Sequence, residues 1–468
     1  MKWKSTRELN PNNNYEFTDV LLMGPASDGG LIIPETIPQL SDEKINSWKN
    51  LSYRDLMFEV ISLFCTDDDI PNTTLKNLID KSYDRFREEE VVKLSEVANK
   101  YILELYHGPT FSFKDVALQF IGELYNYVAK TKGSKINVLG ATSGDTGSAA
   151  IHAIYNNPDL KICILYPYGQ VSDIQRKQMT SIMNDNVLML AINGCFDDCQ
   201  TIVKTIFNDP ELKSGFSLRA VNSINIVRIL AQVVYYFYAY FQLPDEAKNK
   251  DIIFSVPSGN FGDALAGYYA KKMGLPIKIV VATNENDVLT RFVRDGVYER
   301  RAKTASTFSP AMDIQIASNL ERYLYDLGNA ENVQDWMQKV AKGEAINFSC
   351  EQKEKIKKDL MTESASNEAC LNKIKEYWKK YNYLMDPHTA CGVYAADKLF
   401  GDNENTQLVC LSTAHPGKFN EAIVQECEID QPLPEELAKL QDKKEKSETL
   451  ENDFEAVSER LKTFFKKP

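Results

Sequence analysis

The stretch "INVLGATSGDTGSAAIHAIY", residues 136–155, contains the change of pattern that decides the fold. Its first residues, "INVLGA", are mostly apolar and lack polar alternation, which is typical of a parallel strand buried on both faces. Small and polar residues follow as "TSGDTG", and "SAAIHAIY" then has the composition of a helix. A strand, a short turn and a helix in this order indicate an α/β fold.

The same alternation extends along the chain in both directions. Further β-rich runs begin at Lys161, Val187, Asp251, Ile277 and Thr406. Between them the sequence predicts helices over Asp173–Ile182, Asp197–Phe207, Ile224–Phe241 and Ala264–Lys272. Strands that alternate with helices predict a parallel sheet wrapped by helices.

The length of 468 residues exceeds one compact core of ordinary size, so several domains are expected. We expect an N-terminal domain (1–95), an α/β core of a large and a small subdomain (96–300), a helical insertion (301–382), a return to the core (383–430) and a charged C-terminal helical tail (431–468).

Composition excludes several functional classes. The net charge of −12 disfavours binding to nucleic acid or to an anionic membrane. The nine cysteines and four histidines show no spacing of metal ligands, so we expect reduced, mostly buried thiols and no metal. Neither a secretion signal nor an apolar run long enough to span a bilayer is visible, which predicts a cytoplasmic protein.

A second glycine-rich turn follows the run "DIIFSV", in "PSGNFGDALAGYYAKKMGLP", residues 257–276. Gly259 and Gly262 permit positive φ and a close approach of the backbone to a ligand, and the following helix offers free N–H groups. Such turns bind phosphate or carboxylate groups, although a turn of this kind can also serve packing alone. Neither turn has the spacing of a dinucleotide or nucleoside-triphosphate site, so the predicted ligand group is a single phosphate, a carboxylate or one of each.

A lysine in "HGPTFSFKDVALQFIGELYNYV", residues 107–128, lies on the apolar side of a predicted helix. Lys114 precedes Ile121 by seven residues and Val128 by fourteen, which places all three on one face. Burial favours the free amine, which can react with an aldehyde cofactor. A reactive lysine together with a phosphate cradle is what pyridoxal 5′-phosphate (PLP) requires, whereas the alternative is a lysine that reaches solvent beside Asp115.

Several long motifs, in order, resemble threonine synthase of the fungal and bacterial branch. They are "LYHGPTFSFKD", "GATSGDTGSAA", "NSIN…RILAQ", "VPSGNFGD", "SPAMDIQIASNLER" and "STAHPGKF". The resemblance covers the chain from near its N-terminus to about Phe419. It implies the tryptophan-synthase-β-like fold, fold type II, of PLP-dependent enzymes.

The resemblance also implies roles for individual residues. Lys114 forms the internal aldimine with PLP and acts as general base. The cofactor phosphate loop comprises Gly259, Asn260, Phe261, Gly262 and Asp263, and Thr413 offers its hydroxyl to the pyridine nitrogen. The substrate carboxylate is held by the turn of Thr142, Ser143, Gly144, Asp145 and Thr146. Since Asp145 and Asp263 are unsuited to binding anions, we expect both to cap the following helices and to point away from the ligand.

The implied reaction converts O-phospho-L-homoserine and water to L-threonine and phosphate, by a monomer or homodimer. We expect Arg228, Lys418 or a basic residue of the N-terminal section to hold the leaving phosphate, and Asn222 and Asn225 to face the substrate. Two alternatives stay open: a threonine-synthase-like phospho-lyase that yields a 2-oxo acid, and a non-catalytic relative that keeps the fold. Visible absorbance that borohydride abolishes would separate an enzyme from the non-catalytic relative.

Overall fold

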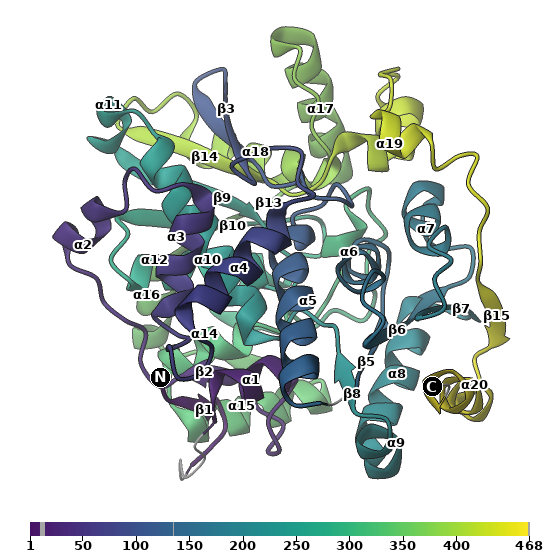
Figure 1. The fold of residues 1–468 in the computed structure, drawn as a ribbon. Coiled ribbons are helices and arrows are strands. Elements are labelled where there is room, and N and C mark those ends of the chain that lie inside the picture. Colours follow the sequence, from purple (N-terminus) through teal and green to yellow (C-terminus); the bar gives the residue numbers. More distant parts are fainter. Residues whose placement is uncertain (10–14, 134, 467–468) are drawn as a thin grey trace.

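The computed structural model describes residues 1–9, 15–133 and 135–466, and among these residues two large sheets dominate (Figure 1). The first has the order β13 (Leu360–Ser364), β10 (Ile277–Thr283), β9 (Asp251–Pro257), β14 (Thr406–Ser412), β4 (Lys100–Glu104) and β3 (Lys93–Val97). The second has the order β15 (Glu448–Glu451), β7 (Val187–Asn193), β6 (Leu160–Pro167), β5 (Ile136–Ala141) and β8 (Leu218–Ala220). Two small antiparallel pairs join β1 (Trp3–Ser5) to β2 (Ile32–Pro34) and β11 (Val297–Tyr298) to β12 (Ile346–Asn347).

Both large sheets are parallel, apart from the antiparallel edge strand β3. Central strands such as β9 and β14 are buried over nearly their whole length, because helices cover both faces. The fold class predicted from the sequence is therefore confirmed, and every β-rich run named above forms a strand.

Helices surround the two sheets. The N-terminal helices are α1 (Phe17–Leu22), α2 (Asp42–Ser47), α3 (Tyr53–Ser62) and α4 (Asn72–Tyr83). The central helices are α5 (Lys114–Thr131), α6 (Asp145–Ile154), α7 (Asp173–Thr180), α8 (Phe196–Asn208), α9 (Pro210–Gly215), α10 (Ile226–Gln242), α11 (Asp245–Lys248), α12 (Gly262–Lys272) and α13 (Val288–Asp295). The later helices and turns are η1 (Pro310–Met312), α14 (Leu320–Leu327), α15 (Ala330–Lys342), α16 (Cys350–Asp359), α17 (Asn367–Tyr381), α18 (Pro387–Phe400), η2 (Pro416–Lys418), η3 (Glu421–Glu426), α19 (Glu435–Ala438) and α20 (Phe454–Lys466).

Helix α10 is the centre of the helical layer and packs against α3, α5 and α12. It is buried almost all round, as a helix with apolar residues on every side must be. The apolar stretch around Ile229–Phe241 is thus an interior helix. Within the described ranges, no helix combines the length and the apolar character that crossing a membrane requires.

The chain after Arg300 contains three strands that the sequence did not predict, the short β12 of the pair β11–β12, β13 and β15. β13 extends the first sheet at its edge beside β10, so the region predicted as a helical insertion also contributes to the sheet. β15 lies in the region predicted as a charged helical tail and pairs in parallel with β7, and α20 then packs on the same sheet. The prediction of a purely helical tail is therefore wrong over the described part of that region, residues 431–466. The proposed domain boundaries stay a prediction.

All nine cysteines are free thiols, and seven of them are buried. Only Cys195 and Cys350 are exposed.

Candidate active site

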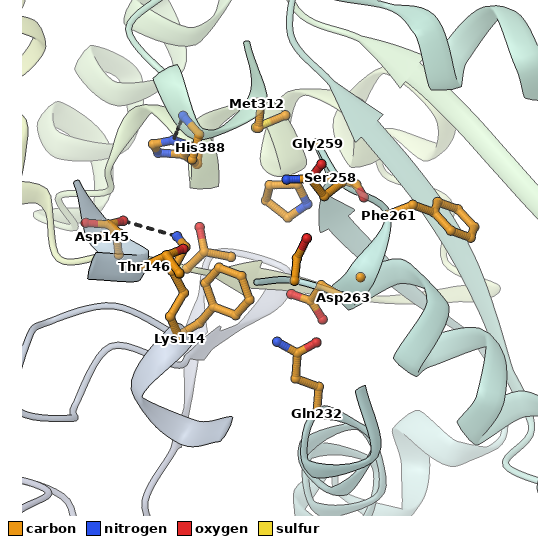
Figure 2. Close-up of a pocket in the computed structure, with 18 of the residues that line it drawn as sticks. Lys114, Asp145, Thr146, Gln232, Ser258, Gly259, Phe261, Asp263, Met312 and His388 are labelled. Carbon is orange, nitrogen blue, oxygen red and sulfur yellow. Dashed lines mark hydrogen bonds and ion pairs between the residues drawn. The ribbon is translucent and has the colours of Figure 1, made fainter. Parts of the chain in front are cut away.

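A cavity lies where the carboxyl ends of strands from both large sheets meet, as expected for ligand sites in open α/β sheets (Figure 2). Its walls come from the starts of α5 and α6, the β9–α12 turn, α10, η1, α18 and the segment after β14. Figure 2 shows Lys114 and Asp145 on one side of the cavity and Ser258 to Asp263 on the other. The structure thus brings together two turns and a lysine that are far apart in sequence.

Lys114 is the first residue of α5 and is buried, with an exposed fraction of 8%. Its Nζ lies 3.3 Å from Asp145 Oδ2 and 4.7 Å from the ring centre of Phe113. Burial lowers the pKa of Lys114, and the attraction of Asp145 offsets this only in part because Arg228 and Lys418 lower it further. The predicted buried lysine is therefore found at the wall of the cavity, and the alternative of a lysine reaching solvent is wrong.

Asp145 points into the cavity, contrary to our expectation that it caps α6. It is the first residue of the helix, no side-chain capping bond forms there, and its carboxylate lies between two ammonium groups. Oδ1 lies 2.5 Å from Lys418 Nζ and accepts from Gln175 at 2.8 Å. Burial opposes ionisation, but Lys418 and Lys114 hold the pKa of Asp145 well below its usual value. Two buried cations required this counter-charge, which the local sequence did not reveal.

The β9–α12 turn has the features of an anion cradle. Phe261 adopts φ 62°, a left-handed conformation that is uncommon for a residue with a side chain. The N–H groups of Gly259, Asn260 and Phe261 donate to no acceptor among the described residues, and the buried Ser258 Oγ has no partner there either. Gly259 also approaches the η1 segment closely, because a Cβ there would lie 2.8 Å from the Ala311 carbonyl oxygen. Unpaired donors at a helix N-terminus suit a phosphate group.

Asp263 does not cap α12 either. Its Oδ1 accepts hydrogen bonds from Tyr235 and Tyr236 of α10, at 2.5 and 2.8 Å, while Oδ2 is buried without a partner in the described structure. Burial raises the pKa of Asp263 to about 6, although the two tyrosines oppose this shift. The carboxyl group lines the cavity, so our expectation that it points away from the ligand was wrong.

Two further polar atoms of α10 lie buried at the cavity without a partner among the described residues. They are Arg228 Nη1 and Gln232 Oε1. Burial lowers the pKa of Arg228 to about 10, a cost that an anionic ligand would offset. Lys418 is fully buried, but it is engaged by Asp145 and by the Thr110 carbonyl oxygen, which accepts at 2.9 Å. Of these two predicted phosphate-binding residues, only Arg228 lines the cavity, and its Nη1 is unpartnered there.

The "TSGDTG" turn contributes less of its length to the cavity than predicted. Asp145 and Thr146 line the cavity, whereas Thr142, Ser143 and Gly144 are absent from its walls. The Thr142 hydroxyl accepts from the N–H groups of Gly144 and Gly147, which holds the turn together.

The two asparagines of "NSIN" also have local partners. Asn225 caps α10 by accepting from the Val227 N–H and donates to the Leu21 carbonyl oxygen. Asn222 accepts from the Ile224 N–H, and neither asparagine lines the cavity.

Thr413 and His388 complete the site. Thr413 lines the cavity and its hydroxyl has no hydrogen-bond partner among the described residues. His388, which no sequence motif above indicated, faces the cavity from α18. The Asp386 carboxylate pairs with its Nδ1 at 2.8 Å, and its Nε2 accepts from the Ala311 N–H at 3.3 Å. The order Asp386–Pro387–His388 is a helix-start signal that would have placed the histidine at a helix N-terminus.

Comparison with known proteins agrees with this geometry. Three family descriptions match the chain: Threonine synthase N terminus over residues 2–83, Pyridoxal-phosphate dependent enzyme over 89–413, and Threonine synthase, C-terminal over 389–460. The threonine synthase of Saccharomyces cerevisiae is 45% identical, over 97% of this chain and 96% of its own length. The chain belongs to the threonine synthase family.

A solved structure and a second relative are also similar to this threonine synthase family member over nearly its whole length. A crystal structure of PLP-bound threonine synthase from Brucella melitensis superposes with a TM-score of 0.93 at 40% identity and covers 100% of both chains. Threonine synthase-like 2 of Xenopus laevis is 33% identical, over 98% of this chain and 97% of its own length. The protein is thus a PLP-dependent enzyme of fold type II.

The residues at the cavity fit PLP. The buried amine of Lys114 suits the aldehyde of the cofactor, and the unpaired donors of the β9–α12 turn suit its phosphate. The free hydroxyl of Thr413 suits a ring nitrogen that needs a neutral partner.

Proposed function

We propose that the protein converts O-phospho-L-homoserine and water to L-threonine and inorganic phosphate. The observation that supports this most directly is the unpartnered guanidinium of Arg228 in the same cavity as Lys114 and the β9–α12 turn. A substrate phosphate needs an anion seat in addition to the one for the cofactor phosphate. Arg228 is the proposed second seat.

When bound, PLP would supply an aldehyde for the substrate amine and a ring that accepts electrons from the substrate carbons. We assign its anchorage to Lys114, its phosphate to Ser258 and the Gly259–Asp263 turn, and its ring nitrogen to Thr413. Lys114 Nζ, once free, acts as the general base, because its lowered pKa favours the neutral amine that a base requires.

Asp145 and Thr146 are the proposed polar contacts on the substrate side of the cavity. Since Asp145 stays ionised between Lys114 and Lys418, it holds the lysine amine in place and stabilises the proton that the amine accepts. The N–H groups at the start of α6 and the Thr146 hydroxyl would then bind the substrate carboxylate, and the Asp145 carboxylate would not.

We also propose that the enzyme acts in the cytoplasm, as a monomer or homodimer, on a small molecule and without nucleic acid. The net charge of −12 supports the last point.

The reaction is tested by incubating the holoenzyme with O-phospho-L-homoserine and measuring phosphate, threonine and 2-oxo acid together. We expect phosphate and threonine in equal amounts. Phosphate accompanied by a 2-oxo acid would instead identify the phospho-lyase reaction, and no phosphate release would refute both. Arg228→Lys serves as a conservative variant: it keeps the charge but loses the planar fork, so KM should rise more than kcat falls.

A further inference from the structure

A stripe of polar residues on α5 faces away from the catalytic cavity. Gln119, Glu123, Asn126 and Lys130 follow one another at intervals of four, three and four residues, so they share one helical face. Helix α5 packs between α4 and α6 (Figure 1), and this face lines a second cavity of about 200 Å³. A space of that size holds about seven water molecules at about 30 Å³ each, or a ligand of about ten heavy atoms.

The second cavity has an excess of cations. Lys81, Arg85 and Lys130 line it as exposed residues at its rim, and within the described part of the chain none of the three is ion-paired with a carboxylate. Arg85 is held in place by neutral acceptors, the Gln119 Oε1 and the His152 carbonyl oxygen, both at 2.7 Å. Its positive charge therefore stays available to an anion.

The same cavity also offers acceptors for a positively charged or hydroxyl donor. Asn126 Oδ1 is buried and has no hydrogen-bond partner among the described residues. Glu123, one helical turn away, lines the cavity and makes no ion pair there. A ligand that satisfies both needs donors next to its anionic groups.

The α5–α6 wall of the cavity is fixed by close packing. Gln119 is 3% exposed, and its amide nitrogen donates to Asp115 and to the Ala149 carbonyl oxygen of α6. Helices α5 and α6 approach so closely at Gly122 that a Cβ would lie 2.5 Å from the Ala153 carbonyl oxygen. The space between α4, α5 and the end of α6 is thus set by the packing of the core.

We propose that this cavity binds a small acidic amino acid. Its two anionic groups would meet Lys81, Arg85 and Lys130, and its ammonium group would meet Glu123 and the unpartnered Asn126 Oδ1. The three cations and one carboxylate match a ligand with two negative groups and one positive group. This assignment is independent of the reaction proposed for the catalytic cavity.

The test compares L-aspartate with succinate, which has the same two carboxylates and lacks the ammonium group. Calorimetric titration of the holoenzyme at constant ionic strength should show saturable binding of L-aspartate, at least tenfold tighter than that of succinate. Lys81→Glu/Lys130→Glu should weaken L-aspartate binding at least tenfold and leave turnover unchanged, because neither lysine lines the catalytic cavity. Glu123→Gln should reduce the preference for L-aspartate over succinate.

Lys76→Glu is the control for Lys81→Glu alone, because both lysines lie on α4, both variants reverse one charge, and only Lys81 lines the cavity. If the double glutamate variant loses its fold, judged by circular dichroism, Lys81→Ala/Lys130→Ala replaces it. Binding that is absent, that survives both double variants, or that favours succinate would overturn the proposal. L-aspartate that binds at the catalytic cavity instead would change the visible absorbance of the cofactor, and the double variant would retain this change. If L-aspartate binds only there, the proposal is overturned as well.

Discussion

Individual charges at the catalytic cavity are balanced by partners from distant segments. Lys114 and Lys418 are both buried, and the single carboxylate of Asp145 contacts both of them. Removing one member of such a group leaves an uncompensated buried charge, which costs about 3–5 kcal/mol in comparable cases. Side chains at this site therefore affect stability and chemistry together.

Lys114→Ala should abolish the visible absorbance of the holoenzyme and lower turnover at least about 10³-fold, because the amine is both the anchor and the base. Absorbance spectra and phosphate release measure the two effects. Lys130→Ala, on the far end of the same helix, is the control and should retain both. Undiminished turnover in Lys114→Ala would refute the role assigned to this lysine.

Asp115 should make a pH-dependent contribution to the free energy of unfolding. It is fully buried, and burial raises its pKa from 3.8 to about 6, although hydrogen bonds from Thr110 oppose this shift. Between pH 4 and 6 the folded state then binds more protons than the unfolded state, so stability falls as pH rises, by about 3 kcal/mol in total.

Asp115→Asn should remove this dependence, so urea unfolding at pH 4, 5, 6 and 7 should show that the free energy of unfolding of the variant, minus that of the wild type, increases with pH by about 3 kcal/mol. A constant difference across this range would show that Asp115 does not titrate as described.

At the level of elements, the two strand–turn–helix units position the site through their turns. The β5–α6 turn depends on Gly144, whose φ of 143° is unfavourable for a residue with a side chain. A Cβ at this position would also lie 2.6 Å from the side chain of Gln175, which donates to Asp145. The β9–α12 turn uses Phe261 in a left-handed conformation for a comparable purpose.

Gly144→Ala should destabilise the protein by more than about 2 kcal/mol and reduce turnover, because strain and a clash act together beside Asp145. Gly169→Ala separates the two causes: its φ is 71°, but no atom lies within 4 Å of the added Cβ. It should cost about 1 kcal/mol. Equal costs for the two variants, measured by urea unfolding, would exclude the predicted clash.

For the whole molecule, the C-terminal segment completes the second sheet. β15 forms its edge beside β7, and α20 packs Val457, Leu461 and Phe464 against the buried side chains of that sheet. Because β5 of this sheet leads into the turn that positions Asp145, stability of the segment and integrity of the site should be linked.

Leu461→Ala should lower the free energy of unfolding by about 2–5 kcal/mol, since it creates a cavity in this core. Lys462→Ala, on the exposed side of the same helix, should change it by less than about 0.5 kcal/mol. Similar values for both variants would indicate that α20 does not stabilise the sheet.

Local patterns were sufficient to predict the parallel α/β class, the interior Lys114 and the two glycine-rich turns. The periodicity of strands and helices depends on residues a few positions apart in the sequence. It can therefore be recognised without knowing which segments pack together in the folded protein. The directions of Asp145 and Asp263, the strand β15 and the place of His388 could not be predicted in this way. Asp145 turns inward because Lys418 approaches from a distant segment, Asp263 because two tyrosines of α10 bind it, and β15 forms because β7 offers a free edge. These features depend on which segments pack together, a property of the assembled core and not of any short stretch of the chain.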